Sequence, residues 1–104
     1  MEENTTKVAH RQEAQQFVIS LEGEPAFMAY ELANDGTLMV MHTEVPEAYS
    51  GQGYAGQLAK AVLAYAAQQE LKVMPYCTYM AVYLRRHKQQ YQALVSPEFN
   101  LEPS

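Results

Sequence analysis

The chain has 104 residues, 48% of them hydrophobic, which is enough for one domain with one modest core. Its formal net charge of −5 and its lack of a long basic run argue against a dedicated nucleic-acid surface. It has one cysteine, no run that approaches the roughly 18 apolar residues of a membrane span, and an acidic start unlike a signal peptide, so we expect no internal disulfide, no membrane helix and a cytoplasmic location.

The first half of the chain predicts an antiparallel meander of strands. Phe17, Ile19 and Leu21 alternate with their neighbours, as in a strand with one buried face. Asn34-Asp35-Gly36 is a strong hairpin signal, and the strand after it is apolar on both faces, which predicts a central place in the sheet. The four expected strands span residues 8–11, 16–21, 26–32 and 37–45.

The second half predicts a βαβ unit. Residues 54–70 carry apolar side chains at helical spacing, so that one stripe faces the sheet. This stripe contains Ala55, Leu58, Ala59, Val62, Leu63 and Ala66. A short strand at residues 71–76 follows, and the crossover through the helix makes it parallel to the strand at residues 37–45.

Two shorter helices are expected after this unit, at residues 79–86 and 89–95. The fold class is therefore α+β, an antiparallel meander continued by a βαβ unit. One domain spans residues 1–104, with loose ends expected at residues 1–6 and 96–104.

Glycines recur at positions 51, 53 and 56, between the central strand and the long helix. Such a turn lets consecutive backbone N–H groups point into one concave surface, and the helix N-terminus adds unsatisfied N–H groups. These groups suit a phosphate or a pyrophosphate. The segment lacks the Gly-Lys-Ser/Thr of a Walker loop and the glycine spacing of a dinucleotide fingerprint. A tight strand-to-helix turn without a ligand is the alternative.

The segment resembles the acetyl-CoA-binding motif of the GNAT superfamily of N-acetyltransferases. The family pattern, Arg/Gln-x-x-Gly-x-Gly/Ala, falls on Ser50-Gly51-Gln52-Gly53-Tyr54-Ala55. The run His42-Thr43-Glu44-Val45-Pro46, with Cys77 and Tyr79 further on, resembles the minimal, single-domain, YidJ-type GNAT-like subfamily. The resemblance covers about residues 17–95. Ser50 departs from the pattern, which removes a side-chain contact to the cofactor but not the backbone cradle.

The resemblance implies a GNAT-like fold in which the two parallel strands splay and hold acetyl-CoA between them. Residues 8–21 have no room for both of the helices that a typical member carries there, so the N-terminal helices are reduced and the acceptor side is open. The pyrophosphate is expected on the N–H groups of residues 51–56, and a backbone N–H near Val45 is expected to polarise the thioester carbonyl. The cofactor-binding residues are then Val45, Ser50, Gly51, Gln52, Gly53, Tyr54, Ala55 and Gly56.

His42 is the candidate general base. Period-two spacing predicts that Leu38, Val40, His42 and Glu44 share one face of their strand. A histidine among apolar neighbours is usually structural, but this one lies a few residues from the glycine turn, and the resemblance assigns it to the active cavity. Acetyl transfer to an amine requires that the attacking nitrogen lose its proton, and histidine can accept a proton near neutral pH.

Cys77, Tyr79 and Tyr83 are the other catalytic candidates. Cys77 is either a small buried hydrophobe or a thiolate that accepts the acetyl group or contacts the thioester, paired with His42 and aided by the helix N-terminus beside it. Tyr83 or Tyr79 can protonate the departing CoA thiolate, as GNAT enzymes place a tyrosine on this helix. Simple packing is the alternative for each tyrosine.

The only basic cluster, residues 85–88, either contacts the adenosine phosphates or is the cationic end of a helix. His10, His42 and His87 have no metal-ligand spacing, so no metal is expected. The sequence thus predicts an acetyl-CoA-dependent N-acetyltransferase acting on an unidentified amine; because the open acceptor side gives a small amine few contacts, a protein or peptide amine is expected. The alternative is a CoA-binding or protein-interaction module without transfer activity.

Overall fold

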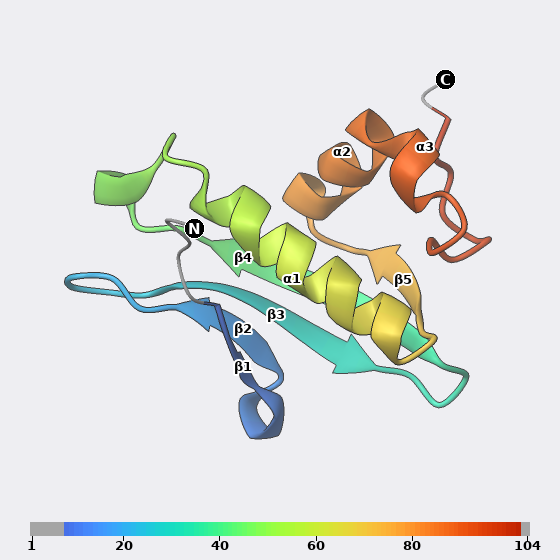
Figure 1. Cartoon of the computed structure of the whole chain (residues 1–104), viewed down its shortest axis with the longest axis horizontal. Helices are drawn as coiled ribbons and strands as arrows, with labels where there is room; N and C mark the ends of the chain where they lie inside the picture. Colours follow the sequence, from blue (N-terminus) through green and yellow to red (C-terminus); the bar gives the residue numbers. More distant parts are fainter. Residues whose placement is uncertain (1–7, 103–104) are drawn as a thin grey trace.

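The fold is a five-stranded sheet with the strand order β1-β2-β3-β4-β5 (Figure 1). This computed structural model describes residues 8–102, and the expected loose end at residues 1–6 lies outside them. The first four strands are antiparallel and β5 is parallel to β4, which confirms the α+β class. The strands are β1 (Ala9–Arg11), β2 (Gln16–Ile19), β3 (Ala26–Leu32), β4 (Thr37–Glu44) and β5 (Lys72–Pro75).

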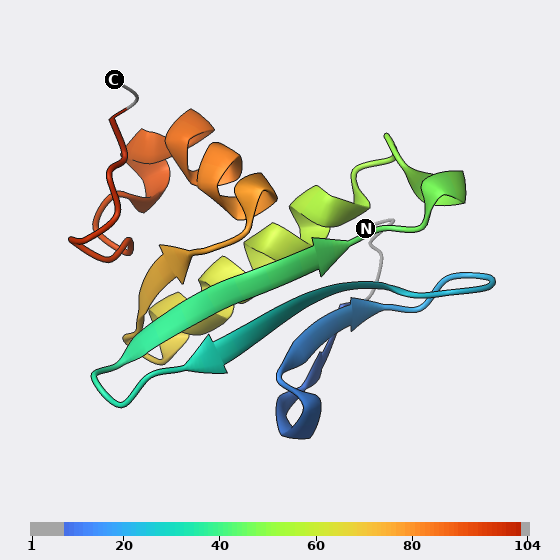
Figure 2. The same cartoon turned by 180° about the vertical axis from the view of Figure 1, so that it is seen from behind.

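The helices of residues 8–102 leave one face of the sheet bare. The long helix α1 (Tyr54–Gln68) crosses one face, and Figure 2 shows the opposite face without a helix over it. The shorter α2 (Thr78–Arg86) and α3 (Lys88–Tyr91) follow β5. Two 3-10 turns, Gln12–Ala14 and Glu47–Tyr49, were not predicted. No helix in the described range is both long and apolar enough to cross a membrane.

The core lies between α1 and the sheet. The α1 stripe is buried almost completely at Leu58, Ala59, Val62, Leu63 and Ala66, as its spacing predicts. It packs on inward-facing side chains of β2, β3, β4 and β5. Burial of each Leu or Val side chain contributes about 1.5–3 kcal/mol. The sheet side of this core contains Phe17, Ile19, Met28, Tyr30, Leu38, Val40 and Val73.

A β-bulge in β4 reverses the expected facing of its last residues. Ala29 pairs with His42 but Tyr30 pairs with Val40, so Met41 is an extra residue on β4. Side chains on either side of a bulge no longer alternate in phase. The prediction that His42 shares a face with Val40 is therefore wrong: Thr43 lies on the α1 side with Val40, and His42 lies on the bare face.

The C-terminal segment packs against β5, where the sequence predicts a loose end. Val95 bridges Val73 in parallel, and the Ser96 N–H donates to the Val73 carbonyl at 2.8 Å. The Phe99 N–H then donates to the Ser96 carbonyl at 3.0 Å, and Ser96 itself is 7% exposed. These backbone contacts hold residues 95–99 along the outer side of β5.

Four aromatic rings fasten the short strand β1 to the core. The His10 ring stacks on Phe17 at 4.0 Å between centroids and meets the Tyr65 ring edge-on at 4.4 Å. A hydrogen bond of 2.5 Å joins His10 Nε2 to the hydroxyl of the buried Tyr30. Burial lowers the pKa of His10 below its ordinary value, because it disfavours the charged ring.

This depressed pKa makes folding stability depend on pH. The unfolded chain binds the His10 proton more readily, so the contribution of His10 is complete above its unfolded pKa of about 6.5 and is lost as the pH falls through the lower folded pKa. We expect the free energy of unfolding to fall between about pH 7.5 and about pH 5.5, and to fall less in His10→Gln. Urea unfolding of both proteins across this range measures the difference, and identical pH profiles would contradict the assignment.

Candidate functional site

The glycine turn between β4 and α1 has the backbone conformation of an open cradle. Gly51 and Gly53 have φ values of +80° and +88°, which favour glycine. A Cβ built on either residue would meet no heavy atom within 4 Å, so the space above the turn is free. The turn therefore has room for a bound group.

The first turn of α1 has N–H groups without a partner in the helical ladder. Gly53 is the N-cap and brings no side-chain hydrogen bond to the helix. The N–H of Gln57 donates to the Gly53 carbonyl at 3.1 Å, so the amides of Tyr54, Ala55 and Gly56 precede the first bond of the helical ladder. With the positive end of the helix dipole, these amides fit a pyrophosphate.

The strands β4 and β5 separate beside this turn. Their pairing ends at Val40 and Pro75, although β4 continues to Glu44. The Tyr76 N–H still donates to the Val40 carbonyl at 2.8 Å, and Cys77 then begins α2 as its N-cap. The end of the pairing agrees with the expected splay of the parallel strands.

Side chains bridge the opening between β4 and α2. The half-buried sulfur of Cys77 accepts a hydrogen bond from the Met80 N–H at 3.4 Å and lies 3.2 Å from Thr43 Oγ1. Thr43 was not among the predicted site residues. Strict alternation along β4 predicts that His42 faces inward and Thr43 outward. Only knowledge of the bulge at Met41 reverses this prediction and points to Thr43.

His42 lies on the other side of the sheet from this pair. Its Nε2 is 3.1 Å from Glu44 Oε1, and both side chains are 60% exposed. Its ring centroid is 5.8 Å from that of Phe27, which also faces the bare side. The structure thus brings Cys77 together with Thr43, and His42 together with Glu44.

The two candidate tyrosines lie in different surroundings. The Tyr79 hydroxyl is 3.5 Å from the position that a Cβ on Gly56 would take, so Tyr79 reaches the first turn of α1. Burial raises the pKa of Tyr79, with a smaller opposing effect of Arg86. Burial, and then Tyr91, raise the pKa of Tyr83 to about 12. Both phenols are therefore protonated near neutral pH, and Tyr79 is the one beside the glycine turn.

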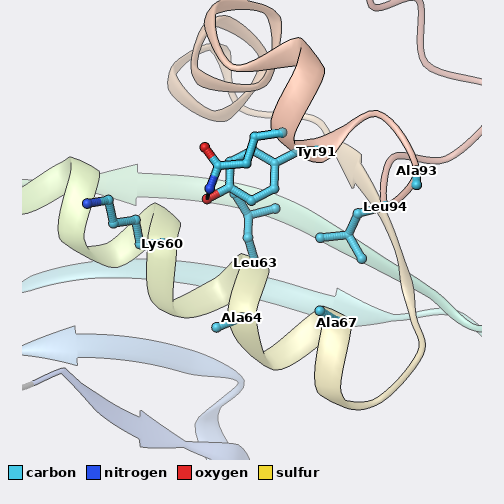
Figure 3. A pocket seen from close by; sticks show the side chains of 8 residues that line it. Lys60, Leu63, Ala64, Ala67, Tyr91, Ala93 and Leu94 are labelled. Carbon is cyan, nitrogen blue, oxygen red and sulfur yellow. Dashed lines mark hydrogen bonds between the residues drawn. The ribbon is translucent and has the colours of Figure 1, made fainter.

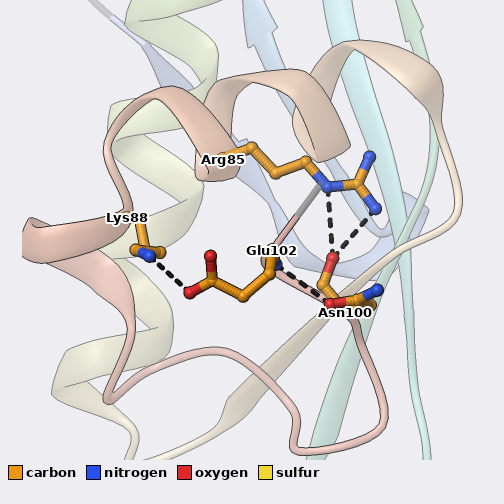
Figure 4. A network of polar contacts seen from close by, with 4 residues as sticks. All are labelled: Arg85, Lys88, Asn100 and Glu102. Atoms are coloured by element: carbon orange, nitrogen blue, oxygen red, sulfur yellow. Dashed lines mark hydrogen bonds and ion pairs between the residues drawn. The ribbon is translucent and has the colours of Figure 1, made fainter. Parts of the chain in front are cut away.

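The basic cluster at residues 85–88 is partly engaged by the C-terminal segment (Figure 4). Arg85 donates from Nε and Nη2 to the Asn100 carbonyl at 3.1 and 2.9 Å, and its guanidinium lies 4.7 Å from the Phe99 ring centroid. Lys88 pairs with Glu102. Two of the four basic side chains thus contact the segment at residues 99–102.

A separate groove lies along the second half of α1 (Figure 3). It has a volume of about 510 Å³ and shares no residue with the glycine turn or with the Cys77 pair. It is lined by Lys60, Leu63, Ala64, Ala67, Gln90, Tyr91, Ala93 and Leu94. In the range 8–102, no three His, Cys, Asp or Glu side chains gather as they do around a metal ion.

Comparison with known proteins gives concordant matches. The family model of the GCN5-related N-acetyltransferases matches residues 16–94. Protein NATD1 from Homo sapiens is 35% identical over 83 residues, which cover 78% of this chain and 74% of that protein. Protein NATD1 from Xenopus tropicalis is 33% identical over 86 residues, or 81% of this chain and 79% of its own.

The solution structure of a GCN5-like protein from Staphylococcus aureus has the same fold. It matches with a TM-score of 0.68 over 90% of this chain and 91% of its own. The sequence identity is 22%, so this likeness concerns the fold alone.

The engagement of Arg85 generates a prediction on stability. Arg85→Ala removes two charge-assisted hydrogen bonds and a cation–π contact, so we expect a loss of about 1 kcal/mol in the free energy of unfolding. Arg86→Ala removes the same charge without contacts to Asn100 or Phe99 and should cost less than about 0.5 kcal/mol. Urea unfolding compares the two variants, and equal losses would show that the contacts of Arg85 contribute nothing.

Proposed function

This chain belongs to the family of GCN5-related N-acetyltransferases, and we propose that it transfers an acetyl group from acetyl-CoA to an amine. The observation that carries this proposal is the open glycine turn at the start of α1, next to the point where β4 and β5 separate. The run from His42 to Pro46, with Cys77 and Tyr79, supports a further assignment to the minimal YidJ-type subfamily.

Acetyl-CoA binds, in this proposal, with its pyrophosphate on the N–H groups of residues 51–56. Ser50, Gln52 and Tyr54 border the same turn, and the thioester lies toward the opening between the two strands. A backbone N–H near Val45 polarises the thioester carbonyl. Holding the reactants at this opening supplies much of the rate enhancement, because the reaction needs little covalent help from the protein.

The donor and the acceptor approach the opening from opposite faces of the sheet. The glycine turn, Tyr79 and Cys77 line the α1 side, whereas His42 and Glu44 line the bare side. On the bare side His42 takes the proton that the amine gives up, and Glu44 orients its ring. On the α1 side Tyr79 protonates the departing CoA sulfur, with Tyr83 as the alternative acid.

Two routes lead to the acetylated amine. In the direct route the amine nitrogen attacks the acetyl carbon, the C–N bond forms, and the thioester C–S bond breaks. In the second route the Cys77 thiolate attacks first, so that a C–S bond to Cys77 forms as the bond to the CoA sulfur breaks. The amine nitrogen then attacks the acetyl carbon, so that the C–N bond forms as the bond to Cys77 breaks, and Cys77 leaves as a thiolate with the electron pair. In both routes the CoA sulfur leaves with the electron pair and takes a proton.

The acceptor supplies its own binding surface in this proposal. No helix covers the bare face within residues 8–102, so a small amine finds few walls there (Figure 2). Exposed apolar side chains occur near this end of β4: Met41, which is 40% exposed, directly precedes His42, and Tyr76, which is 58% exposed, donates its backbone N–H to the Val40 carbonyl. A lysine-containing protein or peptide fits this face better than a small amine, and the acidic balance of the chain favours a cationic partner.

A CoA-binding or protein-interaction module without transfer activity is the second candidate. Ser50 in place of Arg or Gln favours it, and so does the separation of His42 from Cys77 by the sheet. The two candidates share the glycine cradle but differ in turnover.

A negative charge placed in the glycine turn tests the proposed pyrophosphate site. Gly53→Glu should abolish binding of acetyl-CoA, because the carboxylate enters the anion site beside the pyrophosphate. Gly53→Ala is the matched control, since both variants carry the strain of about 1–2 kcal/mol of a side chain at positive φ. It should bind within about tenfold of the wild type. Calorimetric titration measures both, and normal binding by folded Gly53→Glu would refute the cradle.

Turnover separates the two candidate functions. We expect release of CoA with lysine-containing peptides, at a kcat/KM at least about tenfold above that of a simple polyamine, because the peptides contact the bare face. His42→Ala should lower kcat by about 10²-fold or more, as loss of a general base does. Binding of acetyl-CoA without release of CoA for any amine supports the module instead, and equal use of the polyamine contradicts the peptide acceptor.

A further inference from the structure

We infer that Thr43 is a positioning residue that holds and activates the sulfur of Cys77. The inference rests on the proposed function for its role in catalysis, since it concerns the thiol that faces the donor side of the opening. The alternating sequence pattern of β4 predicts that the Thr43 side chain faces away from the site.

The bulge at Met41 creates this contact. It turns Thr43 to the α1 side, where Thr43 pairs across the sheet with Met28, a residue with 0% exposure. The backbone of Thr43 is therefore fixed on the side where Cys77 lies, and its Oγ1 reaches within 3.2 Å of Cys77 Sγ.

Cys77 is held from its other side by α2. As the N-cap residue it accepts the Met80 N–H, and this fixes the direction of the sulfur. The helix spans nine residues, so its N-terminus adds a positive dipole end at the sulfur. One donor and one hydroxyl thus converge on the only thiol of the chain.

A hydroxyl at this position serves both ionisation states of the sulfur. The neutral thiol can donate its hydrogen to Thr43 Oγ1 while it accepts the Met80 N–H. After loss of the proton to water, the Thr43 hydroxyl rotates and donates to the thiolate, which then has two donors. A methyl group in place of the hydroxyl cannot make this second bond. Thr43 therefore favours the nucleophilic form of Cys77.

Alkylation of the chain's single cysteine measures this effect directly. Thr43→Val keeps the shape of the side chain and removes the hydroxyl, whereas Thr43→Ser keeps the hydroxyl. A charge-assisted hydrogen bond changes the thiolate population about tenfold, and the higher nucleophilicity of the less stabilised thiolate offsets about threefold of that loss. We expect Thr43→Val to react with iodoacetamide about threefold more slowly at neutral pH, and Thr43→Ser to react like the wild type.

Controls separate this inference from the proposed function. Thermal melts of both variants check that the fold is retained, and Cys77→Ala gives the background of alkylation. An unchanged rate in folded Thr43→Val overturns the inference, even if the protein transfers acetyl groups. Slower alkylation of Thr43→Val, together with a wild-type rate in Thr43→Ser, supports the inference, even if no acetyl-CoA binds and the proposed function fails. Mass spectrometry after mixing with acetyl-CoA adds a readout: an acetyl group on Cys77 should form more slowly in Thr43→Val than in Thr43→Ser.

Discussion

The unequal pairing of β4 with its two neighbours is the constraint on which the site depends. β4 is hydrogen-bonded to β3 as far as Glu44 but to β5 only as far as Val40. Its last residues are thus held firmly on one side and are free on the other. The opening that results is not a flexible gap, because the β3 register fixes the backbone of Thr43 and the N-cap contact fixes Cys77.

The site divides its chemistry between backbone and side chains. In the proposed function, anion binding rests on amides of the glycine turn and of α1, which every residue except proline supplies as long as the backbone keeps its path. In the proposed mechanism, proton transfer rests on His42 and Tyr79 and the covalent route on Cys77; the directions of these side chains depend on one bulge and one helix start. A homologue could therefore lose acetyl transfer and still bind CoA at the glycine turn. This is why a few side-chain differences separate the two candidate functions.

Local patterns predicted the elements well and the long-range details poorly. The strand at residues 26–32 and the stripe of α1 follow strong periodicities, and the glycine turn needs backbone angles that glycine supplies. The bulge was missed because β4 is apolar on both faces, so an extra residue leaves no break in the pattern. The packing of residues 96–102 was missed because it arises from contacts with Val73 and Arg85, which lie far away in sequence.

The covering of β5 by Val95 affects how this sheet can meet another chain. One edge strand, β1, has three residues, and the other has its outer side occupied by the segment around Val95. Neither edge of the described sheet offers a long row of unpaired backbone groups on which a foreign strand could be added. Strand addition, whether in a complex or in aggregation, is thus disfavoured at both ends. Recognition by this sheet has to proceed through the side chains of its bare face, and these side chains can change without disturbing the backbone ladder beneath them.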